Sequence, residues 1–297
     1  MIKAKDLKGT GVAVVTPFTK NKEVDFDALK RIVNYLIDGG VDYLVALGTT
    51  AETATLTTEE QKAIADCVFK ETAGRVPLVI GAGGNNTQAV INTIEQNEWI
   101  QQYDSLLIAT PFYNKPNQEG LYQHYKAIVQ STSLPIVLYN VPGRTGVNMS
   151  AETSLKLAND FQNIIAIKEA SGNLIQINRI INQKPNHFEV ISGDDGLTLP
   201  MIAIGAIGVI SVLANALPKE MSRLVNAALT GDYVQAQKMQ KVLFEISQKI
   251  FAEGNPTGIK VLMEQKGLIK NGLRLPLLPA SATLENELSR CFLDLES

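Results

Sequence analysis

Eight short apolar runs, separated by helical patterns, constrain the fold of this chain more than any other feature. The runs recur roughly every thirty residues, which is typical of βα units. Parallel strands require a crossover of a dozen or more residues, usually a helix, and the intervals can provide one. We therefore expect an α/β fold, a closed (β/α)8 TIM barrel, with strands over Gly11–Thr16, Tyr43–Leu47, Leu78–Ile80, Ser105–Ala109, Ile136–Tyr139, Ile164–Ala170, Phe188–Ile191 and Val209–Val212.

Residues that begin helices support this division of the chain. Asp25 precedes an amphipathic stretch as an N-cap would, and Thr57 with Glu60 has the spacing of a capping box. After about residue 220 the sequence predicts helices only. We therefore expect two units, a barrel with the active site over residues 1–222 and a C-terminal helical bundle over residues 223–297. The helices expected in the bundle include Tyr233–Ile250 and Ala280–Leu293.

One stretch has the length of a membrane span. Residues 196–218 contain no charged side chain. Pro200, Gly205 and Gly208 interrupt the stretch, whereas a spanning helix needs about twenty consecutive apolar residues. A short helix, a buried strand and a turn explain it better, and we expect no membrane span.

Composition and charge exclude several other classes of protein. The net charge is −3, and the lysines and arginines are scattered, so no basic face for nucleic acid is expected. The two cysteines, Cys67 and Cys291, form no disulfide framework, and the N-terminus has no signal pattern, which together indicate a cytoplasmic protein. His124 and His187 have no nearby Cys or His in the sequence, so no metal site is expected.

Lys168 stands out because it ends a run that is otherwise typical of a strand buried on both faces. Burial of an ammonium is costly unless it is paired or loses its proton. A lysine with a lowered pKa is the nucleophile that forms Schiff bases with carbonyl compounds. Active sites of TIM barrels lie at the carboxyl ends of the strands, which is where Lys168 stands. A lysine that extends to solvent from a strand end is the alternative.

Other polar residues follow the same ends of neighbouring strands. Thr49 and Thr50 lie in a loop that can hold a carboxylate, Tyr139 has a phenol that can transfer protons, and Arg144 has a guanidinium suited to a second carboxylate. Each also has a simpler explanation. The threonines can cap a turn, the tyrosine can be a hydrogen-bonded core residue, and the arginine can be solvated. The pattern favours covalent chemistry on a keto acid.

Several of these segments resemble the signature segments of the pyruvate-dependent class I aldolase superfamily, and most closely those of the dihydrodipicolinate synthase family. The resemblance covers essentially the whole chain. It is carried by Gly48–Glu52, Tyr139–Gly146, Ile167–Ala170 and Gly208–Val212. It implies a TIM barrel that condenses pyruvate with aspartate semialdehyde in lysine and diaminopimelate biosynthesis, without a metal or other cofactor.

The resemblance also implies roles for individual residues. Lys168 forms the Schiff base with pyruvate, and Tyr139, Thr50 and Tyr113 form a proton relay, with Tyr113 reaching in from a neighbouring subunit. The implied assembly is a homotetramer made of two tight dimers. Substrate-binding roles fall on Thr49, Thr50, Arg144, Gly193 and Ile210, with Thr49 and Thr50 holding the pyruvate carboxylate and Arg144 that of the semialdehyde.

The sequence departs from the family pattern in the threonine loop and at the positions that bind an inhibitor. Ala51 replaces the usual glycine of the threonine loop. The positions that bind inhibitory lysine in responsive members are Thr58, Gln61, Ala89 and Phe112 here, next to Asn85, and provide no carboxylate for an ammonium. We therefore predict weak or absent inhibition by lysine.

Two alternative functions remain open from the sequence. N-acetylneuraminate lyases and 2-keto-3-deoxy sugar acid aldolases share the lysine, the tyrosine and the loop, although Arg144 favours a small second carboxylate over a sugar chain. A barrel used only as a binding scaffold is the second, because a fold alone does not determine function.

Overall fold

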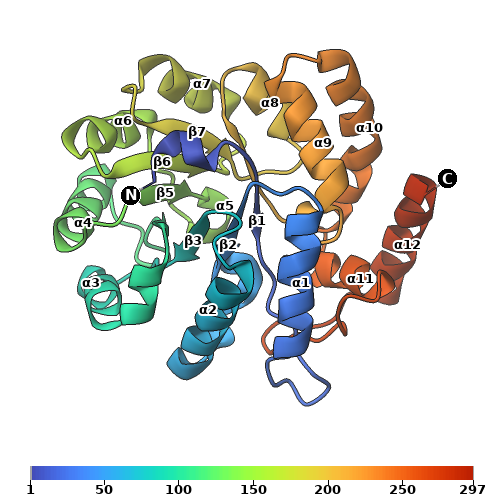
Figure 1. The fold of residues 1–297 in the computed structure, drawn as a ribbon. Helices are drawn as coiled ribbons and strands as arrows, with labels where there is room; N and C mark the ends of the chain where they lie inside the picture. Colours follow the sequence, from blue (N-terminus) through green and yellow to red (C-terminus); the bar gives the residue numbers. More distant parts are fainter. Residues whose placement is uncertain (1, 297) are drawn as a thin grey trace.

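Eight parallel strands form a closed barrel at the centre of the molecule (Figure 1). Residues 2–296 are described by a computed structural model. The strands follow one another around the barrel in chain order, and β8 pairs with β1. Helices surround the barrel, and the C-terminal helices lie together on one side of it. The predicted (β/α)8 barrel with a C-terminal helical extension is therefore confirmed.

The elements are bounded as follows. The strands are β1 (Gly9–Ala13), β2 (Tyr43–Ala46), β3 (Leu78–Gly81), β4 (Ser105–Ala109), β5 (Ile136–Asn140), β6 (Ile164–Glu169), β7 (Glu189–Ser192) and β8 (Gly208–Ser211). The α-helices are α1 (Phe26–Asp38), α2 (Thr58–Thr72), α3 (Thr87–Gln96), α4 (Gln118–Ser131), α5 (Pro142–Thr145), α6 (Ala151–Asp160), α7 (Leu174–Gln183), α8 (Thr198–Ala203), α9 (Pro218–Leu229), α10 (Tyr233–Lys249), α11 (Thr257–Gln265) and α12 (Ala282–Glu296). Short 3-10 turns are η1 (Ala4–Leu7), η2 (Thr49–Ala51), η3 (Thr53–Thr55), η4 (Glu98–Gln102) and η5 (Leu213–Asn215).

The helix starts agree with the sequence patterns. Asp25 caps α1 by accepting a hydrogen bond from the backbone N–H of Ala28, and Thr57 and Glu60 form a capping box at the start of α2. The first strand begins and ends earlier than predicted. Val15 leaves the ladder because its N–H bonds to the side chain of Asn215.

Side chains fill the inside of the barrel, so it is a packed core and not a pore. The Tyr43 ring occupies the space beside Gly11, where an added Cβ would lie 2.2 Å from the ring. The inner cluster otherwise consists mainly of aliphatic side chains and includes Ala13, Val45, Val79, Leu107, Val137, Ile165, Ala166, Ile191 and Ile210. Packing on this scale leaves only the end of the barrel available for a site.

The C-terminal region begins differently from the expectation. α9 packs against β1 and β8, so it completes the ring of helices around the barrel. The predicted boundary between residues 222 and 223 falls inside this helix, and the division into two domains stays a prediction. Beyond it, α12 packs on both α10 and α11.

The uncharged stretch over residues 196–218 forms α8, β8 and the turn η5, as the sequence predicts. Within residues 2–296, no helix has both the length and the apolar character needed to cross a membrane.

Candidate active site

Lys168 and Tyr139 lie side by side at the carboxyl end of the barrel. They are direct register partners on β6 and β5, so their side chains point to the same face of the sheet. The Lys168 Nζ lies 4.4 Å from the centroid of the Tyr139 ring. The strand pairing alone therefore brings the amine and the phenol together. The neighbouring Glu169 points away and bonds to Asn140 and Gln176, as the alternation along a strand predicts.

The surroundings of Lys168 increase the neutral fraction of its amine relative to an ordinary lysine. The residue is 5% exposed, and burial lowers its pKa from 10.5 to about 8. The carboxylate of Asp195 acts in the opposite direction, and the positive charge of Arg144 lowers the pKa further. A buried amine with this pKa is a nucleophile near neutral pH.

Asp195 is a buried carboxylate whose charge raises the pKa of Lys168. No role was predicted for it from the sequence. It follows β7 and accepts hydrogen bonds from the Ser211 hydroxyl and from the backbone N–H groups of Val212 and Leu213. These bonds fix the carboxylate on the β8 side of the barrel. Burial raises the pKa of Asp195, and the same three donors lower it.

The loop after β2 is held in one conformation by its own side chains. Leu47 and Glu52 both adopt positive φ angles, of 51° and 56°, which non-glycine residues rarely do. The Thr53 hydroxyl donates to the carbonyl oxygens of Leu47 and Gly48, each at 3.0 Å, and the Thr16 hydroxyl donates to that of Ala51 at 2.7 Å. The turn η2 is thus fixed from both ends.

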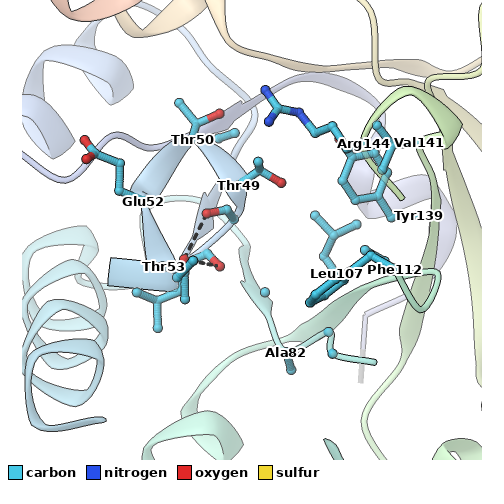
Figure 2. A pocket seen from close by; sticks show the side chains of 18 of the residues that line it. Thr49, Thr50, Glu52, Thr53, Ala82, Leu107, Phe112, Tyr139, Val141 and Arg144 are labelled. Carbon is cyan, nitrogen blue, oxygen red and sulfur yellow. Dashed lines mark hydrogen bonds between the residues drawn. The ribbon is translucent and has the colours of Figure 1, made fainter. Parts of the chain in front are cut away.

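The two threonines of this turn have different neighbours. Thr49 lies on the side of the loop that faces Tyr139, and Thr50 lies farther from that ring (Figure 2). Burial raises the pKa of Tyr139, and the charge of Arg144 and a side-chain hydrogen bond with Thr49 oppose that increase. The Thr50 hydroxyl instead accepts a bond from Asn255 at 3.0 Å. The assignment of Thr50 to a relay with Tyr139 is therefore not supported by the geometry, which places Thr49 there.

A cavity of about 940 Å³ opens above these residues. Lys168, Tyr139, Thr49, Thr50 and Arg144 all line it, together with residues of the loops after β3 and β4. All five were predicted from the sequence as site residues, and the structure brings them together.

Two further predicted site residues differ in position. Gly193 lines the cavity, and a Cβ there would lie 3.1 Å from the Lys168 Cε, so its lack of a side chain leaves room beside the amine. Ile210 does not line the cavity. It is 1% exposed and belongs to the inner core, because its side chain points into the packed barrel beneath.

Tyr113 is the predicted site residue that the single chain leaves outside. It is 88% exposed and has a φ of 72°, next to Phe112, which is 44% exposed. An aromatic residue in this backbone conformation is uncommon and marks strain, which often accompanies function. Tyr113 therefore cannot complete the site of its own chain in this arrangement.

A sequence model of the dihydrodipicolinate synthetase family matches residues 6–293. The chain belongs to this family. The protein named 4-hydroxy-tetrahydrodipicolinate synthase from Phocaeicola vulgatus is 53% identical over 277 residues, 93% of each chain.

Solved structures agree with this family assignment. The dihydrodipicolinate synthase from Thermotoga maritima has a TM-score of 0.95 at 38% identity, covering 98% of this chain and 99% of its own. A chloride-inhibited family member from Acinetobacter baumannii, solved in complex with pyruvate, has a TM-score of 0.93 at 38% identity, covering 98% and 99%.

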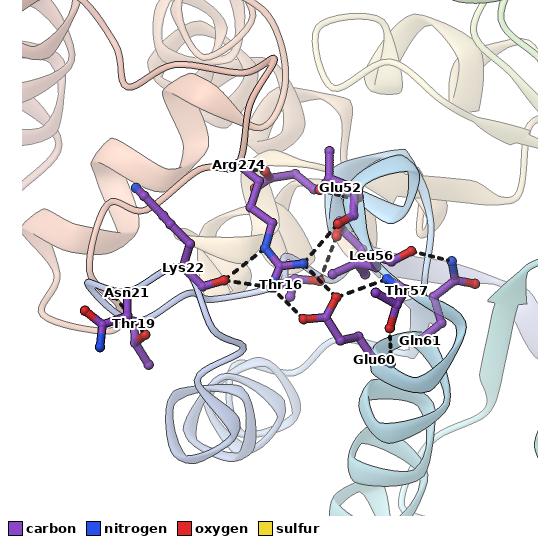
Figure 3. Close-up of polar contacts among 12 residues, drawn as sticks. Thr16, Thr19, Asn21, Lys22, Glu52, Leu56, Thr57, Glu60, Gln61 and Arg274 are labelled. Atoms are coloured by element: carbon purple, nitrogen blue, oxygen red, sulfur yellow. Dashed lines mark hydrogen bonds and ion pairs between the residues drawn. The ribbon is translucent and has the colours of Figure 1, made fainter.

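Ion pairs and hydrogen bonds that were not predicted from the sequence join the threonine loop to the C-terminal region. Glu52 ends the threonine loop and forms a fully buried ion pair with Lys260 of α11. Arg274 donates its backbone N–H to Glu52 and binds Glu60 through its guanidinium (Figure 3). Lys260 also donates to the carbonyl oxygen of Gly272 at 2.7 Å. No sequence pattern indicates the contacts with Glu52 and Glu60, because they join positions more than 200 residues apart.

Across residues 2–296, no three His, Cys, Asp or Glu side chains form a group that could hold a metal ion.

Proposed function

We propose that this chain condenses pyruvate with L-aspartate 4-semialdehyde to give 4-hydroxy-tetrahydrodipicolinate, through a Schiff base on Lys168. The observation that supports this most directly is the buried amine, with a pKa of about 8, beside Tyr139 at the mouth of the barrel. The reaction is the one after which the chain's relatives are named.

The chemistry begins with addition of the neutral Lys168 amine to the pyruvate ketone. Loss of water gives a protonated imine, which draws electrons from the adjacent methyl group so that a proton leaves and an enamine forms. The enamine carbon attacks the aldehyde of the second substrate. The amino group of that substrate then replaces Lys168 in the imine, which closes the ring and releases the free enzyme. The protonated imine is itself the electron acceptor in this scheme, so no cofactor is required.

The proton transfers fall to Tyr139 and Thr49. The phenol stands next to the amine, and Thr49 lies on the side of its loop that faces the phenol. Burial keeps the phenol protonated at neutral pH, since its pKa is raised, so it enters the cycle as an acid. Thr50 provides a hydroxyl for the pyruvate carboxylate, and the exposed Arg144 provides a guanidinium for the carboxylate of the semialdehyde.

Trapping tests this proposal. Incubation with pyruvate followed by borohydride should add a reduced pyruvate group to the peptide that contains Lys168, as measured by mass spectrometry. Lys168→Met should form no adduct and should have no condensing activity. A wild-type protein that forms no adduct, or forms it on another lysine, would contradict the proposal.

The second substrate distinguishes this activity from those of related enzymes. We expect turnover with aspartate semialdehyde and no cleavage of N-acetylneuraminate or of 2-keto-3-deoxygluconate. The relatives named above favour the same choice. The alternative of a binding scaffold without catalysis would be wrong if the wild type shows turnover and Lys168→Met abolishes it.

Tyr113 completes the relay from a second copy of the chain, within a homotetramer made of two tight dimers. Its 88% exposure and strained backbone support a role at a contact between subunits. Mixing Tyr113→Phe chains with Lys168→Met chains tests this. A hybrid dimer would contain one site with both intact residues, so activity should reappear on mixing. Lack of recovery in dimers shown to have exchanged subunits would contradict it. A cytoplasmic location stays a prediction.

A further inference from the structure

The Thr50 side chain is held from outside the barrel. Asn255, in the segment between α10 and α11, donates its Nδ2–H to the Thr50 Oγ1 at 3.0 Å. Both residues are buried, at 7% and 2% exposure, and both line the cavity that contains Lys168. The C-terminal extension therefore contacts the threonine loop directly.

This bond determines what the Thr50 hydroxyl can do. A hydroxyl has one proton to donate, and its orientation is otherwise free to rotate. Because Thr50 accepts from Asn255, its own O–H must point elsewhere. Among residues 2–296, the Thr50 side chain makes no other hydrogen bond. Its O–H therefore remains available to an acceptor in the cavity.

The Asn255 side chain has a buried polar atom that costs stability. Its Oδ1 is buried and has no hydrogen-bond partner among the described residues. Reversing the amide would place the NH₂ group in that unpartnered position, and buried unpaired N–H groups are rarer than buried unpaired carbonyls. A leucine of similar size would avoid the unpaired oxygen altogether. Stability alone therefore does not explain an asparagine here.

The loop itself is anchored independently of Asn255. Glu52 bonds to Lys260 and to the backbone N–H of Arg274, and Thr53 bonds back to Gly48. Replacement of Asn255 should leave the backbone of the loop in place. A change in pyruvate binding when Asn255 is replaced would then result from the orientation of the Thr50 hydroxyl and not from movement of the loop.

We infer that Asn255 is a positioning residue for the first substrate: by occupying the acceptor side of the Thr50 hydroxyl, it directs the hydroxyl proton at the carboxylate of a bound keto acid. This rests on the proposed function. It assigns a part in substrate binding to the C-terminal extension, outside the eight strands and their loops.

Asn255→Leu and Thr50→Val, alone and together, test the inference. Asn255→Leu should weaken pyruvate binding about tenfold or more, the effect of misdirecting one hydrogen bond to a charged group. The Michaelis constant for the semialdehyde should change little. The melting temperature should stay the same or rise, since the unpaired carbonyl is removed. In the Thr50→Val background, Asn255→Leu should have no further effect on pyruvate binding.

Asn271→Leu is the matched control. Asn271 also has a buried Oδ1 without a partner and belongs to the same extension, but it does not line the cavity. Its replacement should leave pyruvate binding unchanged.

The outcomes separate the two claims. If the wild type forms the pyruvate adduct and Asn255→Leu binds pyruvate equally well, the inference is wrong and the proposed function stands. The inference would also be wrong if Asn255→Leu weakened pyruvate binding equally in the wild type and in Thr50→Val. That result would show a general disturbance of the site. Absence of the adduct in the wild type would overturn the proposed function and the inference together.

Discussion

Lys168 should react as a free amine at a pH where ordinary lysines are almost fully charged. Burial lowers its pKa from 10.5 to about 8. At pH 7 the neutral fraction is then about one in ten, compared with about one in three thousand for an unperturbed lysine. The structure thus provides an increase in nucleophile concentration of about 300-fold, which corresponds to about 3 kcal/mol.

The same difference affects stability, with a definite sign. The folded-state pKa lies below the unfolded-state value, so between pH 8 and pH 10.5 the unfolded chain binds more protons than the folded chain. The free energy of unfolding should therefore rise with pH through this window, by up to about 3 kcal/mol from Lys168. Lys260, whose pKa burial also lowers to about 8, contributes in the same direction. The Lys168 contribution is the difference between the wild type and Lys168→Met.

Two measurements check this reasoning. Brief acetylation with acetic anhydride across a pH series, quantified on the Lys168 peptide by mass spectrometry, should give a midpoint near pH 8 in the folded protein. The denatured protein should give a midpoint near 10.5 and is the control. Arg144→Met should raise the folded midpoint, because Arg144 lowers the pKa of Lys168. A folded midpoint near 10.5, or unfolding curves of wild type and Lys168→Met that stay parallel with pH, would refute the argument.

Three further predictions concern the surroundings of the site. Lys260→Met should lower the free energy of unfolding by about 3–5 kcal/mol in urea titrations, because it leaves the buried Glu52 carboxylate without its ion-pair partner; the double variant with Glu52→Gln should recover part of the loss, and equal losses in both would contradict this. Gly193→Ala should reduce the rate of adduct formation with pyruvate, since the new methyl group would lie 2.8 Å from the Ala170 Cβ and 3.1 Å from the Lys168 Cε; an unchanged rate would show that both neighbours can move aside. L-Lysine should inhibit weakly or not at all in a steady-state assay, because Thr58, Gln61, Ala89 and Phe112 provide no carboxylate for the ammonium; a submillimolar inhibition constant would overturn that prediction.

The sequence by itself determined the architecture and the central amine. The eight apolar runs and their spacing predict the barrel, because strands buried on both faces and crossover helices leave strong patterns in local sequence. Lys168 was identifiable because a charged residue at the end of a buried strand is unusual. The position of Tyr139 beside it follows from register, since neighbouring parallel strands of similar length bring their ends together.

Only the tertiary structure decided which neighbours the hydroxyls of the threonine loop have. The adjacent residues Thr49 and Thr50 differ in their neighbours because their side chains take different directions in a short turn, and composition does not reveal direction. Ile210 proved to be core because its side chain faces inward. Asn255 and Lys260 come from the extension, where the sequence predicted helices alone. Their contacts join distant parts of the chain through single side chains, and such pairings arise from packing and have no local signature in the sequence.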